Sequence, residues 1–420
     1  MADDVPFLMV LVALLVGVAV GKIWERYKRQ EGRWIDRRKA RESPHFILGL
    51  NFLVAHQLDR AIDELGRAAR FQPDATEIEM ILGNLFREKG QVGRAITIHQ
   101  GLLQRPRLTR LEHAYVLLCL GLDYKRGGFV DRALEAFTEV LRFDAQNAYA
   151  LNNLQKLHEE QHQWAEARAV REQLVAITDA SEQPRHEQIL AFLENEMGLA
   201  AMKQHDDADA ALRFTGAIER DPRTVPAYLN LGDVRLHQGR FPEAIAAWER
   251  VAEVSPERAY LMFQRLESLL LSQGDTSRFQ TLCRRLIAAN PQEWRARTAL
   301  AEHLISHGSG TEGLDLLLDA LSHNPHALTV HQAIWRTLMA TGLQPALVRR
   351  YVDMARQSVF YLDPHVCLRC HYRSTELLWQ CPHCHEWDSF VEDRIAPAQD
   401  ALNAPGTEPI PDPHLGLSAP

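Results

Sequence analysis

Four of the six cysteines in the chain lie in two short motifs near the C-terminal end. Cys367 and Cys370 form one C-x-x-C pair, and Cys381 and Cys384 form a second pair after ten intervening residues. Each pair can make a tight turn that aims two sulfurs at one point, and four thiolates suit a closed tetrahedral site for zinc or iron. The spacing therefore predicts one iron or zinc ion bound by these four cysteines.

Other uses of these cysteines fit the sequence less well. Disulfides are rare in the reducing cytosol, where we expect the rest of the chain to lie, and a thioredoxin-like site would need one pair inside a βαβ unit. No open coordination position is evident, which argues against catalytic zinc. The sequence also has no Walker loop, no G-x-G-x-x-G after a strand and no G-x-S-x-G elbow. We expect a protein that is not an enzyme.

The cysteines belong to a predicted metal module at residues 361–393. Residues 375–380 are apolar and aromatic and are predicted to form a strand. The aromatic residues expected to form a small core around the site are Tyr372, Trp379, Trp387 and Phe390. His371 and His385 follow the second cysteine of each pair, where a positive φ is often required. A module this small needs the ion to fold, and its histidines are not needed as ligands.

The composition is that of a folded protein, with 46 % hydrophobic and 24 % charged residues. A length of 420 residues exceeds one ordinary core, so several domains or a repeat array are expected. The net charge of −8 argues against a nucleic-acid binder. Cys119 and Cys283 lie alone in apolar helical patterns, and we expect both to pack in the core.

Residues 1–24 are predicted to be a transmembrane anchor. Residues 5–23 carry a single charge, at Lys22, and nineteen residues at about 1.5 Å each span roughly 28 Å. A cleaved signal peptide would begin with basic residues, but this chain begins with Asp3 and Asp4. Nine basic and three acidic residues lie from Lys22 to Arg41. This bias predicts that the bulk of the protein is cytoplasmic, and the basic segment at residues 25–44 can bind anionic lipids.

Residues 45–360 contain a repeat with a period of about 34 residues. Gly49, Ala61 and Pro73 are 12 residues apart, and the same spacing returns at Gly198, Ala210 and Pro222. This period is typical of tetratricopeptide repeat (TPR) hairpins, which stack because one hairpin cannot bury its apolar face alone. The sequence predicts an all-α TPR superhelix of about nine hairpins. Its later units are more degenerate, above all residues 327–360.

Residue types within the repeat indicate how the helices pack. Glycine or alanine is expected where two helices approach closely, and proline where the second helix ends. The large residues expected to fill the space between hairpins are Leu48, Phe52, Leu82, Phe86, Tyr124, Phe137, Leu231 and Trp248. One spacing widens to 43 residues, and residues 177–188 are predicted to be a longer loop between repeats.

The first helix of each TPR hairpin usually lines a groove that binds protein or peptide. The polar residues expected to face this groove are Asn84, Arg87, Lys125, Arg126, Lys203, Asp233 and His237. A solvated helix face explains any one of them equally well. Residues 394–420 are rich in proline and alanine and are predicted to be disordered.

An anchor, a TPR array and a four-cysteine module, in this order, resemble the lipopolysaccharide assembly protein B family. The resemblance covers residues 5–393 and is most specific at CLRC, at LLWQCPHCHEWDSF and at VGKIWERYKR. It implies a single-pass protein of the bacterial inner membrane with a periplasmic N-terminus. It also implies a rubredoxin-like metal module that packs against the repeats.

The function that this resemblance implies is that of a regulatory adaptor in lipopolysaccharide biosynthesis and assembly. Such an adaptor helps a membrane ATP-dependent metalloprotease degrade the deacetylase that commits precursors to lipid A, and it is linked to the lipopolysaccharide export machinery. Two other functions remain open on the residues. One is a rubredoxin-like electron carrier on a TPR scaffold, and the other is a zinc-ribbon nucleic-acid reader, which the net charge disfavours. Homo-oligomer formation also stays open.

Overall fold

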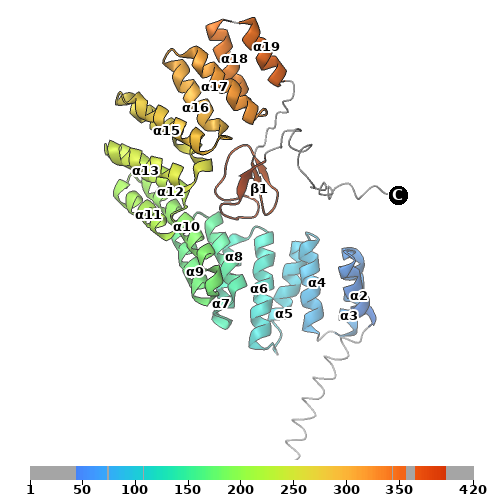
Figure 1. Cartoon of the computed structure of the whole chain (residues 1–420). Coiled ribbons are helices and arrows are strands. Elements are labelled where there is room, and N and C mark those ends of the chain that lie inside the picture. Colours follow the sequence, from blue (N-terminus) through green and yellow to red (C-terminus); the bar gives the residue numbers. More distant parts are fainter. Residues whose placement is uncertain (1–43, 73–74, 107, 343, 356–364, 394–420) are drawn as a thin grey trace, which may run out of the picture. The chain divides into compact units, whose positions relative to one another are not determined.

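The computed structural model describes residues 44–72, 75–106, 108–342, 344–355 and 365–393. Within these residues, eighteen α-helices pair as nine hairpins, followed by a small three-stranded sheet (Figure 1). The chain divides into two compact units between Asp179 and Ala180. The predicted anchor at residues 1–24 and the predicted tail at residues 394–420 lie outside the described residues. Among the helices that are described, none has the length and apolar character needed to span a bilayer.

The first unit contains four hairpins. Their helices are α2 (Pro44–Val54) with α3 (Leu58–Phe71), α4 (Thr76–Glu88) with α5 (Val92–Leu103), α6 (Arg110–Arg126) with α7 (Val130–Phe143), and α8 (Ala148–Glu160) with α9 (Trp164–Ile177).

The second unit contains five hairpins. Their helices are α10 (Gln183–Lys203) with α11 (Asp207–Arg220), α12 (Val225–His237) with α13 (Phe241–Val254), α14 (Tyr260–Ser272) with α15 (Thr276–Ala289), α16 (Trp294–Ser306) with α17 (Gly310–His323), and α18 (Leu328–Thr341) with α19 (Pro345–Ala355). Two short 3₁₀ helices, η1 (Ala180–Glu182) and η2 (Pro256–Arg258), precede α10 and α14.

The turn inside each described hairpin contains one residue with positive φ. Six of these turns use glycine, and the other three use His56, His162 and His205, with φ between 55° and 60°. A side chain in this left-handed region costs roughly 1–2 kcal/mol. All nine described turns therefore keep a positive φ, although histidine is less suited to it than glycine.

Five of the described hairpins pair a glycine on the first helix with a larger residue sixteen positions later on the second helix. A Cβ added to Gly232 would lie 2.2 Å from Trp248 Nε1, and one added to Gly121 would lie 2.7 Å from Phe137. Trp248 and Phe137 are fully buried. They therefore fill space inside their own hairpins. They also contribute to the predicted packing between neighbouring hairpins.

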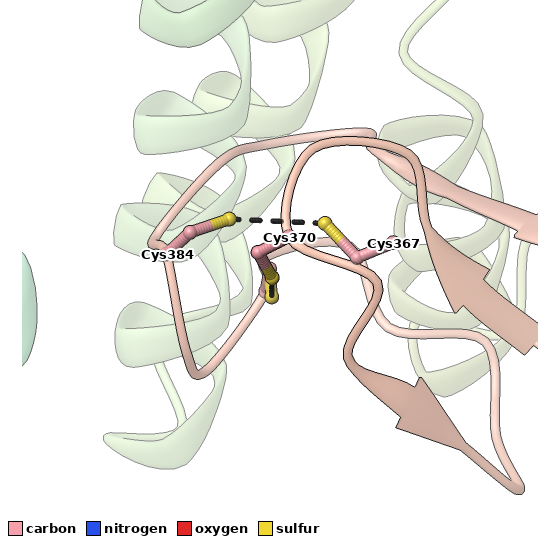
Figure 2. A group of neighbouring side chains, drawn as sticks. Cys367, Cys370 and Cys384 are labelled. Atoms are coloured by element: carbon pink, nitrogen blue, oxygen red, sulfur yellow. Dashed lines mark hydrogen bonds between the residues drawn. The ribbon is translucent and has the colours of Figure 1, made fainter. Parts of the chain in front are cut away.

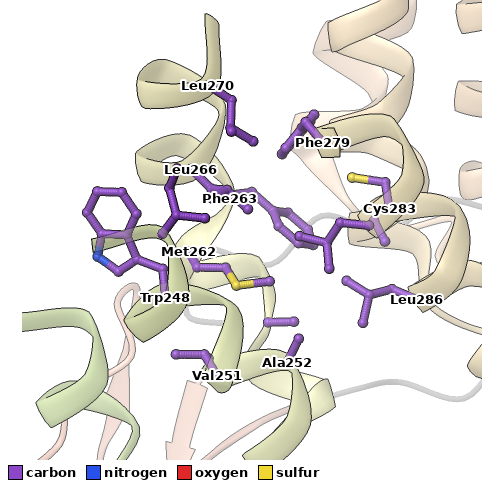
Figure 3. Close-up of a cluster of buried hydrophobic side chains, with 14 of the residues drawn as sticks. Trp248, Val251, Ala252, Met262, Phe263, Leu266, Leu270, Phe279, Cys283 and Leu286 are labelled. Atoms are coloured by element: carbon purple, nitrogen blue, oxygen red, sulfur yellow. The ribbon is translucent and has the colours of Figure 1, made fainter. Parts of the chain in front are cut away.

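The largest core of the second unit joins three successive hairpins. Figure 3 shows Trp248 of α13, Met262 and Leu266 of α14, and Phe279 and Cys283 of α15 among its side chains. All five are no more than 1 % exposed. Phe279, which takes a position where the repeat usually has alanine, is accommodated inside this core.

Two predictions about the repeats are wrong. Residues 177–188 are mostly helical rather than a loop, because α10 begins at Gln183 and is 21 residues long. The extra residues in the 43-residue spacing lengthen α10 at its N-terminal end. Leu48 is 44 % exposed and does not fill a space between hairpins, since α2 is the first described helix and no described hairpin precedes it.

Candidate metal centre and its contacts with the helices

Three short antiparallel strands form the framework of the metal module. They are β1 (His365–Cys367), β2 (Arg373–Ser374) and β3 (Phe390–Glu392), in the order β2-β1-β3. The predicted strand at residues 375–380 is wrong: β2 ends at Ser374, and only Gln380 pairs further, in an isolated bridge to Trp387. The apolar side chains of this segment, Leu377 and Leu378, instead pack beside the cysteines.

The two C-x-x-C motifs form matching turns. His371 N–H donates to the Cys367 carbonyl at 2.9 Å, and His385 N–H donates to the Cys381 carbonyl at 2.8 Å. His371 and His385 have φ of 58° and 56°, in agreement with the positive φ predicted for both. The turns therefore present their two sulfurs in the same way.

The four cysteine sulfurs meet in one cluster (Figure 2). Cys367 Sγ lies 3.7 Å from Cys384 Sγ, Cys370 Sγ lies 3.6 Å from Cys381 Sγ, and all four sulfurs lie within 4.8 Å of one another. Bonds of about 2.3 Å from a tetrahedral ion would place the sulfurs about 3.8 Å apart. The donor set therefore fits one zinc or iron ion, and no histidine belongs to the cluster among the described residues.

The environment of Cys367 favours a charged sulfur. Burial acts to raise the pKa of Cys367, but hydrogen bonds from the Ser389 hydroxyl and from backbone N–H groups of the same turn outweigh it and lower the pKa to about 6. Ser389 Oγ lies 3.2 Å from Cys367 Sγ. Burial raises the pKa of Cys384 to about 12 in the absence of an ion. Because metal ligands must be thiolates, the Cys367 turn is prepared for metal binding.

Aromatic residues of the module face the helices more than the sulfurs. Phe390 packs with the cysteines, as predicted. Trp387, however, stacks on Phe192 of α10, with ring centroids 5.3 Å apart and planes 19° apart, and Trp379 packs against the core of α12–α16. Tyr372 is 41 % exposed, but its ring meets Phe390 edge-on with centroids 6.5 Å apart. The predicted core of four aromatic residues is therefore wrong for the two tryptophans.

Three arginines from three successive parts of the second unit bind acidic residues of the module. Arg185 of α10 donates to Glu386 and, at 3.1 Å, to the Trp387 carbonyl.

Arg258 of η2 pairs with Asp388 at 2.8 Å and lies over the Trp379 ring, and Arg295 of α16 pairs with Glu392 at 2.7 Å. The Arg295 and Glu392 side chains are 13 % and 19 % exposed, so this pair is largely shielded from solvent.

No direct signal in the sequence pointed to these three arginines. The widened spacing before α10 was the available clue, because Arg185 and Gln188 both lie in the part of α10 that the widening adds. Gln188 Nε2 also donates to Asp388 Oδ2 at 3.3 Å. The lengthened helix therefore contributes directly to the contact with the module.

The groove residues predicted in the first unit lie on the expected helices, but two of the four form ion pairs within the array. Arg87 of α4 pairs with Asp123 of α6 at 3.0 Å, and Lys125 pairs with Glu160 of α8 at 3.6 Å. Asn84 has a buried Oδ1 that accepts no hydrogen bond in the structure, and Arg126 is exposed.

The predicted groove residues of the second unit lie near the C-terminal ends of their helices. Asp233 of α12 accepts from Arg265 of α14 at 2.9 Å, which links two neighbouring hairpins. Lys203 and His237 are exposed. Partner binding by these residues, and by those in the first unit, remains a prediction.

The first unit contains a buried charged cluster that the sequence analysis missed. His99 and Asp123 are both 0 % exposed, and His99 Nδ1 lies 2.5 Å from Asp123 Oδ2. His99 stands sixteen residues after Gly83, where other hairpins have a large apolar residue. This periodic position was the signal that could have identified it.

The two isolated cysteines are buried, as predicted, with 3 % of Cys119 and 0 % of Cys283 exposed. Burial raises the pKa of Cys119 to about 11 and that of Cys283 to about 12. Both thiols are therefore protonated and unreactive at neutral pH, which fits packing rather than chemistry.

Two family models match parts of this chain. Residues 195–260 match the tetratricopeptide repeat family, and residues 365–392 match the rubredoxin metal binding domain. Among solved structures, a tetratricopeptide repeat protein from Parabacteroides merdae is 15 % identical and covers 63 % of this chain and 98 % of its own, with a TM-score of 0.32.

Two curated relatives extend over almost the whole chain. Lipopolysaccharide assembly protein B of Escherichia coli K12 is 26 % identical over 387 residues, which is 90 % of this chain and 97 % of the relative. Its namesake in Haemophilus influenzae is 24 % identical over 399 residues, again 90 % and 97 % of the two chains. The predicted resemblance is thereby confirmed: the chain is related over nine-tenths of its length to lipopolysaccharide assembly protein B and contains TPR hairpins and a rubredoxin-type metal-binding domain.

Proposed function

We propose that this protein is a membrane-tethered, non-enzymatic adaptor that acts in lipopolysaccharide assembly. The relatives named for that process support the proposal, as do the repeats, which are of a class that binds proteins. In finer terms, the adaptor brings the lipid A deacetylase to a membrane ATP-dependent metalloprotease in the inner membrane and so promotes its degradation. It also contacts proteins of lipopolysaccharide export.

The observation that carries the proposal is the link between the four-cysteine site and the array. One closed site holds the module together, and the module in turn contacts α10, η2 and α16 through Arg185, Arg258 and Arg295. A bound iron or zinc ion would supply folding energy to the module through its four thiolates. Metal binding would thereby fix the spacing of the hairpins that hold protein partners.

The deciding experiment separates docking of the module from metal binding. The double variant Arg258→Ala/Arg295→Ala removes two contacts but leaves all four cysteines. We expect its metal content to stay at one ion per chain, while recovery of the protease and the deacetylase by pull-down from membranes falls by at least tenfold. Arg250→Ala is the matched control, because Arg250 is an exposed arginine of the same unit whose partners, Glu253 and Tyr228, both belong to the array.

A normal pull-down with the double variant would contradict the role given to the module. The anchor is tested separately by deleting residues 1–24. We expect a folded protein that no longer raises turnover of the deacetylase in cells, since tethering concentrates the adaptor near membrane-bound partners. Full activity of this truncation would contradict the proposed membrane tether but not the adaptor function.

Electron transfer is the second candidate, because Cys370 and Cys384 are only partly buried and Leu368 beside them is 66 % exposed. Four thiolates around iron can change oxidation state near such a surface. This function requires iron, so a zinc-substituted protein that still supports normal deacetylase turnover would rule it out.

A further inference from the structure

The first hairpin exposes an apolar surface where a terminal repeat normally has a polar one. α2 contains no Asp, Glu, Lys or Arg in its eleven residues. Its side chains Ile47, Leu48 and Val54 are 49 %, 44 % and 81 % exposed. Ile47 and Val54 are seven residues apart, which places them on the same side of the helix. This face of α2 therefore needs a partner.

Another exposed apolar side chain lies at the start of the hairpin, on a different side of α2 from Ile47 and Val54. Phe71, the last residue of α3, is 73 % exposed and stacks on His45 with ring centroids 5.7 Å apart. It thus lies at the end of the hairpin where Pro44 begins. Arg70 and Arg67, both exposed, stand beside it and one turn before it. We call Ile47, Leu48 and Val54 the α2 patch.

The sequence that leads into α2 indicates what covers the α2 patch. The apolar run at residues 5–23 is followed by a segment from Lys22 to Arg41 with nine basic and three acidic residues, and this segment leads to Pro44. Apolar side chains with flanking arginines suit the boundary between headgroups and acyl chains of an anionic bilayer. We infer that the α2 patch lies on the surface of an anionic phospholipid membrane, an inference that rests on the proposed tether.

A second copy of the chain is the competing occupant, and the size of the α2 patch disfavours it. A stable interface buries about 800 Å² on each partner. The three side chains of the α2 patch offer on the order of 300 Å². A bilayer has no such size requirement, because the proposed anchor would keep the patch close to the surface and would make the contact intramolecular in effect.

The test places a fluorophore on the patch in the full-length protein. The variant Val54→Cys is labelled with an environment-sensitive dye and reconstituted into phosphatidylcholine vesicles that contain phosphatidylglycerol and nitroxide-labelled acyl chains. Asp63→Cys, at an exposed position of α3 outside the patch, is the matched control. We expect the lipid to quench the dye at residue 54 at least threefold more than the dye at residue 63. Helical circular dichroism confirms that both variants fold.

Other results would overturn the inference in distinguishable ways. If the protein floats with the vesicles but both dyes are quenched equally, the tether stands and the lipid contact of the α2 patch is wrong. If dyes at residue 54 of two copies instead show self-quenching that dilution removes, the occupant is a second copy. If the protein does not float with vesicles at all, the proposed tether fails, and this inference fails with it.

Discussion

The indole of Trp387 stacks on the ring of Phe192, with centroids 5.3 Å apart, and this contact joins the metal module to α10. Trp387 is 3 % exposed and Phe192 is 2 % exposed, so both rings are shielded from solvent. The metal module is thus a packed part of the second unit, and its stability should depend on the helices beneath it.

Truncation of Phe192 tests this dependence. Phe192→Ala removes the ring beneath Trp387 and should weaken docking of the module by about 3–5 kcal/mol. We expect faster hydrogen exchange throughout residues 365–393 in mass spectrometry, with little change in the first unit. Tyr149→Ala is the control, because Tyr149 has the same repeat position in α8 but is 56 % exposed. Unchanged exchange in the module would contradict the packing role of Phe192.

Removal of the metal should unfold the module but not the array. The module has about thirty residues, and fewer than about forty residues seldom fold without a metal or disulfides. We expect a strong chelator, or Cys367→Ser/Cys384→Ser, to abolish exchange protection in residues 365–393 while the helical circular dichroism signal falls by no more than about a tenth. A module that stays protected without metal would show that packing on α10 is sufficient.

The close approach of Gly232 to Trp248 gives a packing prediction. Gly232→Ala inserts a methyl group 2.2 Å from Trp248 Nε1 and should destabilise the second unit by about 1–3 kcal/mol, because the buried indole has no space to move. Gly216→Ala, in α11, is the control. Its new methyl group would meet only Glu194 at 3.7 Å, so we expect a gain of about 0.5–1 kcal/mol. Urea unfolding followed by circular dichroism measures both changes.

The turn histidines predict a stabilising substitution. His205 has φ of 60°, a conformation that glycine adopts without the steric cost of a Cβ. His205→Gly should therefore raise the free energy of unfolding by about 1 kcal/mol. The reverse change in the next turn, Gly239→His, should lower it by a similar amount. A loss of stability in His205→Gly would indicate that the imidazole makes contacts that outweigh its backbone strain.

The buried thiol of Cys119 should make stability fall at high pH. Its pKa is raised from 9.0 to about 11, so between these values the unfolded thiol loses its proton while the folded thiol keeps it. Ionisation then favours the unfolded state by up to about 1.4 kcal/mol per pH unit. We expect Cys119→Ala to show a shallower loss of stability than the parent between pH 9 and 11. Parallel pH profiles of the two proteins would contradict the raised pKa.

The sequence was most informative where a residue type is tied to one local geometry. The cysteine spacing identified four sulfurs that the structure brings within 4.8 Å, and the positive φ of His371 and His385 followed from the turn that such pairs require. The 34-residue period identified the hairpins for the same reason, since glycine is needed where helices come closest.

Contacts between distant segments could not be predicted from the sequence. Nothing local to Arg185 or Arg295 indicates that each will meet an acidic residue about a hundred or two hundred positions later, because such pairs depend on how the module is placed on the helices. The short strands were missed for a related reason. In residues 375–380 the apolar side chains pack near the sulfurs, and this tertiary contact outweighs their preference for a strand.

The additional N-terminal residues of α10 make the hairpins of this array unequal. In a regular repeat protein, one internal hairpin can in principle be exchanged for another. Here the α10 hairpin carries Arg185, Gln188 and Phe192, which together hold one side of the module, and the other side is held from η2 and α16. A swap of α10 for a helix of ordinary length, or the loss of the hairpin between α10 and η2, would put these anchoring points at the wrong distance. The order and number of repeats between them are therefore under a constraint that the other hairpins do not share.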